Sequence, residues 1–347
     1  DRDRQAAFAR RMVEEIRDLG RPAGQSKIET IFVGGGTPTL LRADLWQQVL
    51  AALHESFDLH SLVEFTVEAN PETVTDELLD VLVAGGVNRM SIGAQSFNDA
   101  HLKTLERWHD PRKVAAAVAM ACRAGIGNIN LDLIFAVPGQ TVNEWADDLQ
   151  AALALEPTHL SCYSLTYEPN TAMTKKLALG MIEPADEAVE AAMFEDTIDT
   201  LTAAGFEHYE VSNFAKRSTE GNIKCQHNLM YWLNGQWLAI GPSASGHVAG
   251  VRWKNVPHLG KYLAGEQTPI QDVEQLDREA SVGEQLMLRL RLIEGVPWDW
   301  CEQALSRKRL WTVDRLIDEG SLDRTATHLR LTRAGLMVAD SIIAELL

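Results

Sequence analysis

The sequence predicts an α/β protein built on a parallel barrel or partial barrel, followed by a small winged-helix-like domain at the C-terminus. Three observations support this. Apolar runs and helical stretches alternate along the first two-thirds of the chain, polar residues recur where each run stops, and residues 315–332 have the pattern of a helix, a turn and a β-wing. Alternation of this kind with short connections is typical of a parallel sheet covered by helices.

Five short apolar runs rich in β-branched residues are predicted to be strands. They are residues 28–33, 62–68, 87–92, 129–135 and 160–165. The stretches between them have helical periodicity, at residues 45–54, 75–84, 99–106, 112–124 and 143–155. Each strand and helix together occupy roughly 30–40 residues, which is the length that a βα unit needs.

Polar or glycine residues follow the end of each predicted strand. They are Gly34, Gly35, Gly36 and Thr37, then Glu68, Gln95, Asp132 and Thr166. In parallel α/β barrels this edge gathers the ligand-binding and catalytic groups. Any one of these residues, Thr37 for example, is also explained by helix capping. Five successive strand ends with polar groups favour a binding site and a barrel.

The rest of the chain is less regular. A long helix is predicted over residues 183–204 and a short strand over 207–211, whereas residues 212–260 look irregular and hold several aromatic residues and histidines. We therefore expect a barrel domain (1–211), a connecting region (212–271) and a C-terminal helical, winged-helix-like domain (272–347). The segment 271–347 has 10 Lys and Arg against 14 Asp and Glu, which argues against a DNA-binding surface.

The composition excludes several classes of function. The chain has 347 residues and a net charge of −17, which disfavours binding to nucleic acid or to anionic membranes. No apolar run is long enough to span a bilayer, and the N-terminal residues have no signal-peptide pattern, so a cytoplasmic protein is expected. The four cysteines, Cys122, Cys162, Cys225 and Cys301, are widely separated and do not indicate a disulfide framework.

Five segments together resemble the radical S-adenosylmethionine (SAM) family that includes the oxygen-independent coproporphyrinogen III oxidases. They are residues 32–39 (FVGGGTPT), 67–72 (VEANPE), 88–97 (NRMSIGAQSF), 130–134 (NLDLI) and 138–141 (PGQT). The resemblance implies a TIM-like partial (β/α)6 barrel. It also implies that this sequence lacks the first strand of that barrel, because its first predicted helix, residues 5–19, corresponds to the helix after the family's cluster loop.

The same resemblance implies a SAM site. Glycines leave room for a ligand to approach the backbone closely, and Gly34, Gly35 and Gly36 correspond to the loop that holds the amino-acid end of SAM. Other positions that match SAM-binding residues of the family are Glu68, Gln95, Arg107 and Asp132, with Thr37 beside the loop. Some of these residues contact a second SAM in the related oxidases, so the molecule that each would contact here stays open.

A second element, Cys225 to Trp232 (CQHNLMYW), resembles the His-Asn-x-x-Tyr element of HemW-type heme chaperones. The resemblance implies that His227 contacts heme as an iron ligand, because imidazole is a common axial ligand of heme iron. Trp232 and Trp237 are candidates to cover the macrocycle. The alternative is a core histidine that is bonded to backbone, with the aromatic residues serving only as packing.

The sequence departs from the family most clearly at the [4Fe–4S] cluster. Radical SAM proteins hold it with a Cys-x3-Cys-x2-Cys loop, which is absent here, and the four cysteines lack the spacing to replace it. We expect that an N-terminal segment with this loop has been lost by truncation or cleavage, rather than that the protein is naturally free of a cluster. Smaller departures are Ala136 and Glu106, where glycine is usual, and Ser243 and Ser245, in a segment where Gly-Ala-His is frequent.

Three functions remain open from the sequence. The first is a heme chaperone that binds heme, SAM and a [4Fe–4S] cluster and passes heme to client hemoproteins. The second is a radical SAM enzyme, similar to coproporphyrinogen III oxidase or to a methyltransferase, that generates a 5′-deoxyadenosyl radical. The third is a binding module with a degenerate site, against which the intact glycine triplet, Glu68, Gln95 and Asp132 all argue.

Overall fold

The structure is a computed structural model that describes residues 2–23, 26–218, 223–265 and 270–347. The chain divides into two compact units. The barrel unit comprises residues 32–40 and 65–224, and the outer unit comprises residues 1–31, 41–64 and 225–347. Two strands, β1 and β2, begin in the outer unit and end in the barrel unit.

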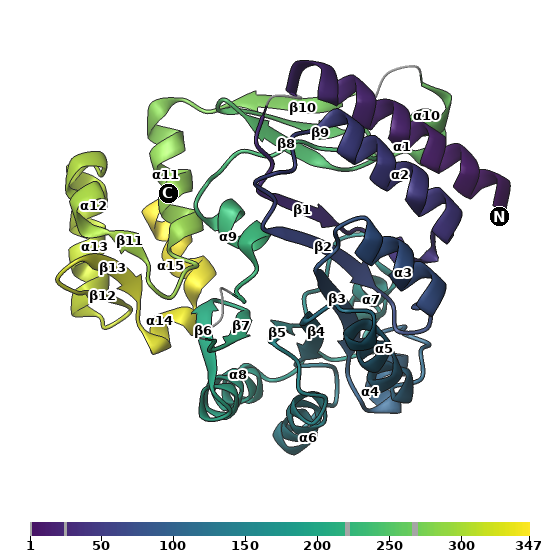
Figure 1. Cartoon of the computed structure of the whole chain (residues 1–347). Coiled ribbons are helices and arrows are strands. Elements are labelled where there is room, and N and C mark those ends of the chain that lie inside the picture. The colour runs from purple at the N-terminus through teal and green to yellow at the C-terminus, as the bar shows by residue number, and fades with distance from the viewer. Residues whose placement is uncertain (1, 24–25, 219–222, 266–269) are drawn as a thin grey trace. The chain divides into compact units, whose positions relative to one another are not determined.

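The main sheet has seven strands in the order β1-β2-β3-β4-β5-β7-β6 (Figure 1). Pairing is parallel from β2 through β5. The strands are β1 (Thr30–Val33), β2 (Glu64–Ala69), β3 (Arg89–Gln95), β4 (Asn128–Phe135), β5 (His159–Ser164), β6 (Phe206–Glu210) and β7 (Asn213–Lys216). The five strands predicted from the apolar runs are therefore confirmed.

The last two strands correct the expectation of a parallel sheet. β7 runs antiparallel to both β5 and β6. Only residues 211 and 212 separate β6 from β7, and a connection this short can join only antiparallel neighbours. The reversal was missed because residues from 212 onward were predicted to be irregular.

Helices pack against the sheet through apolar side chains. Leu79, Val114 and Trp145 of three different helices are completely buried, as are Phe65 and Met90 of the sheet. The helices of this unit are α3 (Asp76–Ala84), α4 (Asp99–Thr104), α5 (Arg112–Arg123), α6 (Val142–Leu153), α7 (Ala172–Ala178) and α8 (Glu187–Ala203), with a 3-10 turn at Pro38–Leu40. Helix α7 was not predicted, and it buries no residue, so it has no apolar periodicity to reveal it.

The outer unit contains a second, antiparallel sheet in the order β10-β9-β8. Its strands are β8 (Ser245–Val248), β9 (Val251–Asn255) and β10 (Ile270–Gln275), and its helices include α1 (Arg2–Ala23), α2 (Ala43–Ser56), α9 (Gln226–Trp232) and α10 (Leu259–Ala264). The prediction that residues 212–260 are irregular was therefore wrong. Ala249 and Gly250 have φ angles of 51° and 77°, as a two-residue hairpin with both central residues in the left-handed region requires.

The C-terminal part of the outer unit has its own hydrophobic core, which includes Leu290, Val296, Cys301, Val313 and Leu329. Its elements are α11 (Arg278–Arg289), β11 (Val296–Pro297), α12 (Trp298–Ala304), α13 (Arg307–Asp318), β12 (Leu322–Arg324), β13 (His328–Leu331), α14 (Arg333–Met337) and α15 (Ala339–Leu346). The strands pair antiparallel in the order β11-β13-β12. The predicted helix, turn and β-wing are present at α13, β12 and β13.

Candidate functional site

The glycine triplet forms an exposed loop directly after β1. Gly35 and Gly36 have φ angles of 81° and 86°, in a region that side chains rarely adopt. A Cβ atom on Gly34 would lie 2.8 Å from Oε1 of Glu68. The backbone N–H of Gly35 donates to Oε2 of Glu68 over 3.0 Å. Glycine is thus required by conformation at two positions and by space at the third. Thr37 ends the loop, and its carbonyl accepts the N–H of Leu40 in the 3-10 turn.

Glu68 and Asp132 are two carboxylates with raised pKa values in the barrel unit. Burial raises the pKa of Glu68, the hydrogen bond from Gly35 opposes that shift, and the charge of Asp132 adds to it. Burial also raises the pKa of Asp132, against hydrogen bonds from Ser91 and Asn130 and the charge of Arg89. Both carboxylates thus hold a proton more readily than exposed ones, which suits groups that receive a cationic or hydroxyl-bearing ligand.

Asp132 does not lie at the end of its strand, contrary to the prediction. β4 continues through Phe135, and Ile134 pairs in register with Tyr163 of β5. The Asp132 carboxylate accepts from the Ser91 hydroxyl at 3.0 Å and from Nδ2 of Asn130 at 2.8 Å. Its orientation is therefore fixed by neighbours on β3 and β4, and it faces the interior side of the strands rather than a loop.

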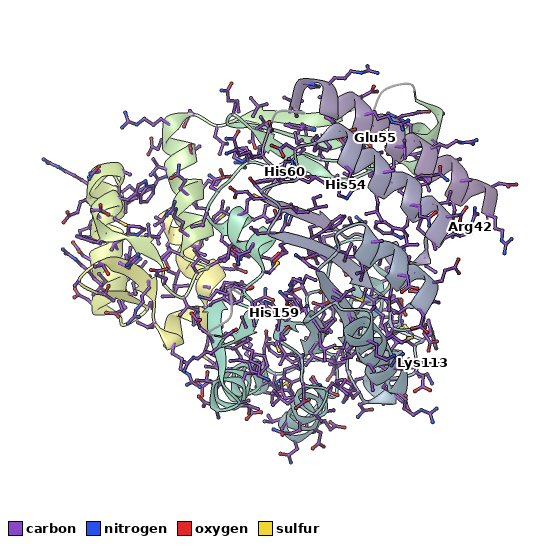
Figure 2. All side chains as sticks on the ribbon, viewed as in Figure 1. Arg42, His54, Glu55, His60, Lys113 and His159 are labelled. Carbon is purple, nitrogen blue, oxygen red and sulfur yellow. The ribbon has the colours of Figure 1, made fainter. Side chains whose placement is uncertain are left out.

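This polar network extends deeper than the sequence indicated. His159 is completely buried (Figure 2), and its Nδ1–H donates to Oδ1 of Asn130 over 2.6 Å. The Tyr209 hydroxyl donates to Nε2 of the same ring over 2.8 Å. Burial and the charge of Arg89 hold the pKa of His159 well below its usual range, so the ring is neutral. Alternating polar residues within the apolar run 159–164 were the signal that could have revealed this network.

Gln95 closes β3 with an unusual backbone. Its φ angle is 65°, and the register against β4 shifts between Gly93 and Gln95. A Cβ atom on Gly93 would lie 2.7 Å from Nε2 of Gln95, so the side chain folds back over its own strand. The buried carboxylate of Asp148 on α6 accepts the Phe97 N–H at 2.6 Å, and the Ser96 hydroxyl donates to the same carboxylate at 2.7 Å. These bonds fix the loop that carries Gln95.

Arg107 lies in the segment after α4 and is exposed. Its neighbour His109 is buried, and its Nε2–H donates to the Ala94 carbonyl of β3 over 3.1 Å. Burial lowers the pKa of His109, so the neutral ring is the favoured form. The segment of Arg107 is thereby tied to the strand that carries Gln95, and the guanidinium stays available to a carboxylate ligand.

The residues of the barrel unit fit SAM but not the iron–sulfur cluster. An open glycine loop and two oriented carboxylates are groups that suit an ammonium and ribose hydroxyls. Within the described ranges, no group of three His, Cys, Asp or Glu side chains is arranged to hold a metal ion. Cys162, Cys225 and Cys301 are buried, and burial raises the pKa of the Cys162 and Cys301 thiols, which opposes the thiolate form that iron requires.

His227 lies in the first turn of α9 and is bonded through both ring nitrogens to side chains. Nδ1 is 2.8 Å from the Thr30 hydroxyl of β1, and Nε2 is 3.2 Å from the Tyr231 hydroxyl. The ring is partly buried. These contacts differ from the alternative of a core histidine bonded to backbone through its ring.

Aromatic rings continue from His227 through the outer unit. The ring centroids of His227 and Tyr231 are 4.9 Å apart, those of Tyr231 and Trp237 are 4.5 Å apart, and those of Trp237 and His247 are 5.0 Å apart. Trp232 instead lies beside Arg291, whose guanidinium is 5.8 Å from the centre of the indole. Of the two tryptophans that the sequence suggested, only Trp237 belongs to this row of rings.

The positions that depart from the family pattern have a shared backbone feature. Glu106, Ala136 and Ser243 have φ angles of 57°, 58° and 64°. All three therefore adopt the left-handed conformation that glycine adopts without strain. The backbone retains the glycine-type conformation even though the side chains have changed.

The chain is similar over most of its length to proteins named heme chaperone HemW. It is 34% identical to that of Lactococcus lactis, over 98% of this chain and 89% of the relative. It is 36% identical to that of Escherichia coli, over 91% of this chain and 83% of the relative.

The chain belongs to the HemW family.

As a member of the HemW family it also matches the model of the radical SAM superfamily over residues 5–152 and that of the HemN C-terminal domain over residues 276–338. Its fold is similar to that of the coproporphyrinogen III oxidase HemN of Escherichia coli, a radical SAM enzyme. The TM-score is 0.85 at 20% identity, and the match covers 100% of this chain and 84% of HemN. The predicted radical SAM fold with a C-terminal domain is thus confirmed, and it implies SAM and a [4Fe–4S] cluster as the family's cofactors.

The helices of the described residues are all too short or too polar to cross a membrane.

Proposed function

We propose that this HemW-family chain is a heme chaperone, which binds heme through His227 and delivers it to client hemoproteins. The observation that carries the proposal is the position of the His227 ring. Its Nε2 faces a single hydroxyl, that of Tyr231, at 3.2 Å. A neutral imidazole nitrogen of this kind is a common axial ligand of heme iron. The names of the relatives support the same function.

The surroundings of His227 suit an apolar macrocycle. Tyr231 and Trp237 form a row of rings with His227, and aromatic faces are good packing surfaces for a planar conjugated ligand. In the proposal, the iron takes the place of the Tyr231 hydroxyl at Nε2. The 3.2 Å contact is at the long end for a hydrogen bond, so its loss costs little.

A heme titration tests this proposal. The Soret absorbance is followed for the parent chain, His227→Ala and the matched control His54→Ala, which removes an exposed histidine of α2 (Figure 2). We expect saturable binding by the parent and the control and its collapse in His227→Ala. Equal binding by all three proteins would show that heme associates elsewhere and would overturn the proposal.

We further propose that the barrel unit holds SAM. Gly34, Gly35, Gly36 and Thr37 would receive its amino-acid end, and Glu68, Gln95, Arg107 and Asp132 would line the rest. Together with a reduced [4Fe–4S] cluster, bound SAM supplies a 5′-deoxyadenosyl radical in this superfamily. The support on the protein side is the open glycine loop, the Gly35–Glu68 hydrogen bond, and the orientation of Asp132 by Ser91 and Asn130.

A pair of glycine substitutions tests the SAM site. Gly36 and Gly205 both have positive φ angles, 86° and 88°, and a Cβ atom would meet nothing within 4 Å at either position. Gly36→Ala and Gly205→Ala should therefore cost similar stability. Only Gly36→Ala should weaken SAM binding, as measured by equilibrium dialysis with labelled SAM. Equal SAM binding by the two variants would place SAM away from this loop.

The alternative function is a radical SAM enzyme, and the same strand-end groups favour it because they would serve SAM cleavage equally well. Protein with a reconstituted cluster should decarboxylate coproporphyrinogen III if it is an oxidase of that type. It should leave this substrate unchanged and take up heme if it is a chaperone.

A further inference from the structure

The first turn of α9, which carries His227, is held by a buried carboxylate. Glu64 is the first residue of β2 and is only 3% exposed. Its Oε2 accepts the backbone N–H of Gln226 at 2.8 Å, and its Oε1 accepts that of His227 at 3.2 Å. The Cys225 thiol donates to the same Oε1 at 3.3 Å. One side chain thus satisfies N–H groups that the start of a helix leaves without partners.

A second side chain orients the ring of the same histidine. The Thr30 hydroxyl lies 2.8 Å from Nδ1 of His227. When Nδ1 donates to this hydroxyl, the proton is fixed on Nδ1 and Nε2 keeps its lone pair. Partners of this kind, which bond to the far nitrogen of a metal-binding histidine, set its tautomer and its orientation.

Glu64 and Thr30 act on different parts of one residue. Glu64 fixes where the backbone of His227 begins the helix, and Thr30 fixes how the ring turns about its own axis. All of these residues belong to the outer unit. Two constraints from two strands are more than helix formation needs, because a helix of seven residues is ordinarily capped by a single side chain at its own N-terminus.

We propose that Glu64 and Thr30 are positioning residues that prepare Nε2 of His227 as the iron ligand for heme. The proposal rests on the proposed function, since it assumes that heme binds at His227. Neither residue contacts the iron. Their effect is to present one defined ring nitrogen at a defined place before heme arrives, which reduces the ordering that binding has to impose.

Substitutions that change one hydrogen bond at a time test this proposal in the full chain. Thr30→Val removes the hydroxyl with little change of shape, and Thr30→Ser retains it. Glu64→Gln keeps one acceptor oxygen and removes the charge, and Glu29→Gln is the matched control at an exposed neighbour of Thr30. Heme affinity is measured by Soret titration, and the low-spin signal of ferric heme is measured by electron paramagnetic resonance. Thermal unfolding confirms that each variant is folded.

We expect Thr30→Val and Glu64→Gln to weaken heme binding by about 10- to 100-fold. We also expect them to reduce the low-spin signal, while Thr30→Ser and Glu29→Gln retain the parent's affinity and spectrum. Parental affinity and spectrum in folded Thr30→Val would overturn the proposal even if Glu64→Gln does not fold. That result differs from failure of the proposed function, in which His227→Ala itself retains the parent's heme binding.

Discussion

Glu68 is the residue at which stability and ligand binding are most directly opposed. Its pKa is raised above the ordinary value of 4.5, mainly by burial. The folded protein therefore binds this proton more tightly than the unfolded chain, so stability falls as the pH rises from about 4.5 through the folded pKa. An ionised Glu68 at neutral pH thus costs stability, which indicates that a ligand rather than the fold requires the carboxylate.

Glu68→Gln should consequently raise the free energy of unfolding at pH 8 relative to the parent, and this advantage should shrink towards pH 4.5. The amide still offers an oxygen to the Gly35 N–H, and it carries no charge to bury. Denaturant unfolding at the two pH values measures the effect, with Glu183→Gln at an exposed position as the matched control. A variant that is less stable than the parent at pH 8 would contradict the prediction.

Ala136 is strained in a way that a single substitution relieves. Its φ angle is 58°, and this conformation costs an L residue roughly 1–2 kcal/mol. Ala136→Gly should stabilise the protein by about 1 kcal/mol, after allowance for the greater freedom of glycine in the unfolded chain. The same substitution at Ala152, a buried residue inside α6, should destabilise by about 1 kcal/mol. Denaturant midpoints of the two variants that move in the same direction would contradict this reading of the backbone.

At the scale of elements, α6 supports the loop that carries Gln95. The carboxylate of Asp148 is only 2% exposed and accepts from Ser96 and Phe97. Asp148→Ala would leave both donors without this partner and should lower the free energy of unfolding by about 2 kcal/mol or more. Asp147→Ala, at an exposed site one residue earlier, should have little effect. A loss of less than 0.5 kcal/mol in Asp148→Ala, on the order expected for an ordinary surface change, would contradict the supporting role.

Elements with a strong pattern were predictable, and those without one were not. The run 129–135 predicted β4 (Asn128–Phe135) closely, because apolar β-branched strands between helices have a clear signature. Helix α7 buries nothing, and β8 and β9 depend on a hairpin that begins with alanine rather than asparagine or aspartate. Neither has a local pattern that distinguishes it from a loop.

The candidate sites were predictable to a similar extent. The glycine loop and Glu68 could be found from strand ends, and the contact between them confirms that they lie together. Glu64, Thr30 and His159 could not be found in this way. Glu64 and Thr30 are separated from His227 by more than 160 residues, and only the tertiary structure brings them together.

At the scale of the whole molecule, the net charge of −17 has a consequence for heme uptake. Heme carries two propionates, so a strongly negative protein repels it at long range, and salt screens that repulsion. The association rate of heme should therefore rise when the ionic strength is raised from about 10 mM to 150 mM. Stopped-flow Soret kinetics measure this rate, with heme dimethyl ester as the uncharged control. A rate that falls with salt would instead indicate a local positive surface that steers the propionates.

The most direct test of the central claim is rescue of His227→Gly by imidazole. The substitution leaves space where the ring now lies between Thr30 and Tyr231. Ferric heme added to this variant should give no low-spin spectrum, and added imidazole should restore one similar to that of the parent. If His227→Gly alone shows the parent's low-spin spectrum, or if imidazole changes nothing, His227 is not the iron ligand.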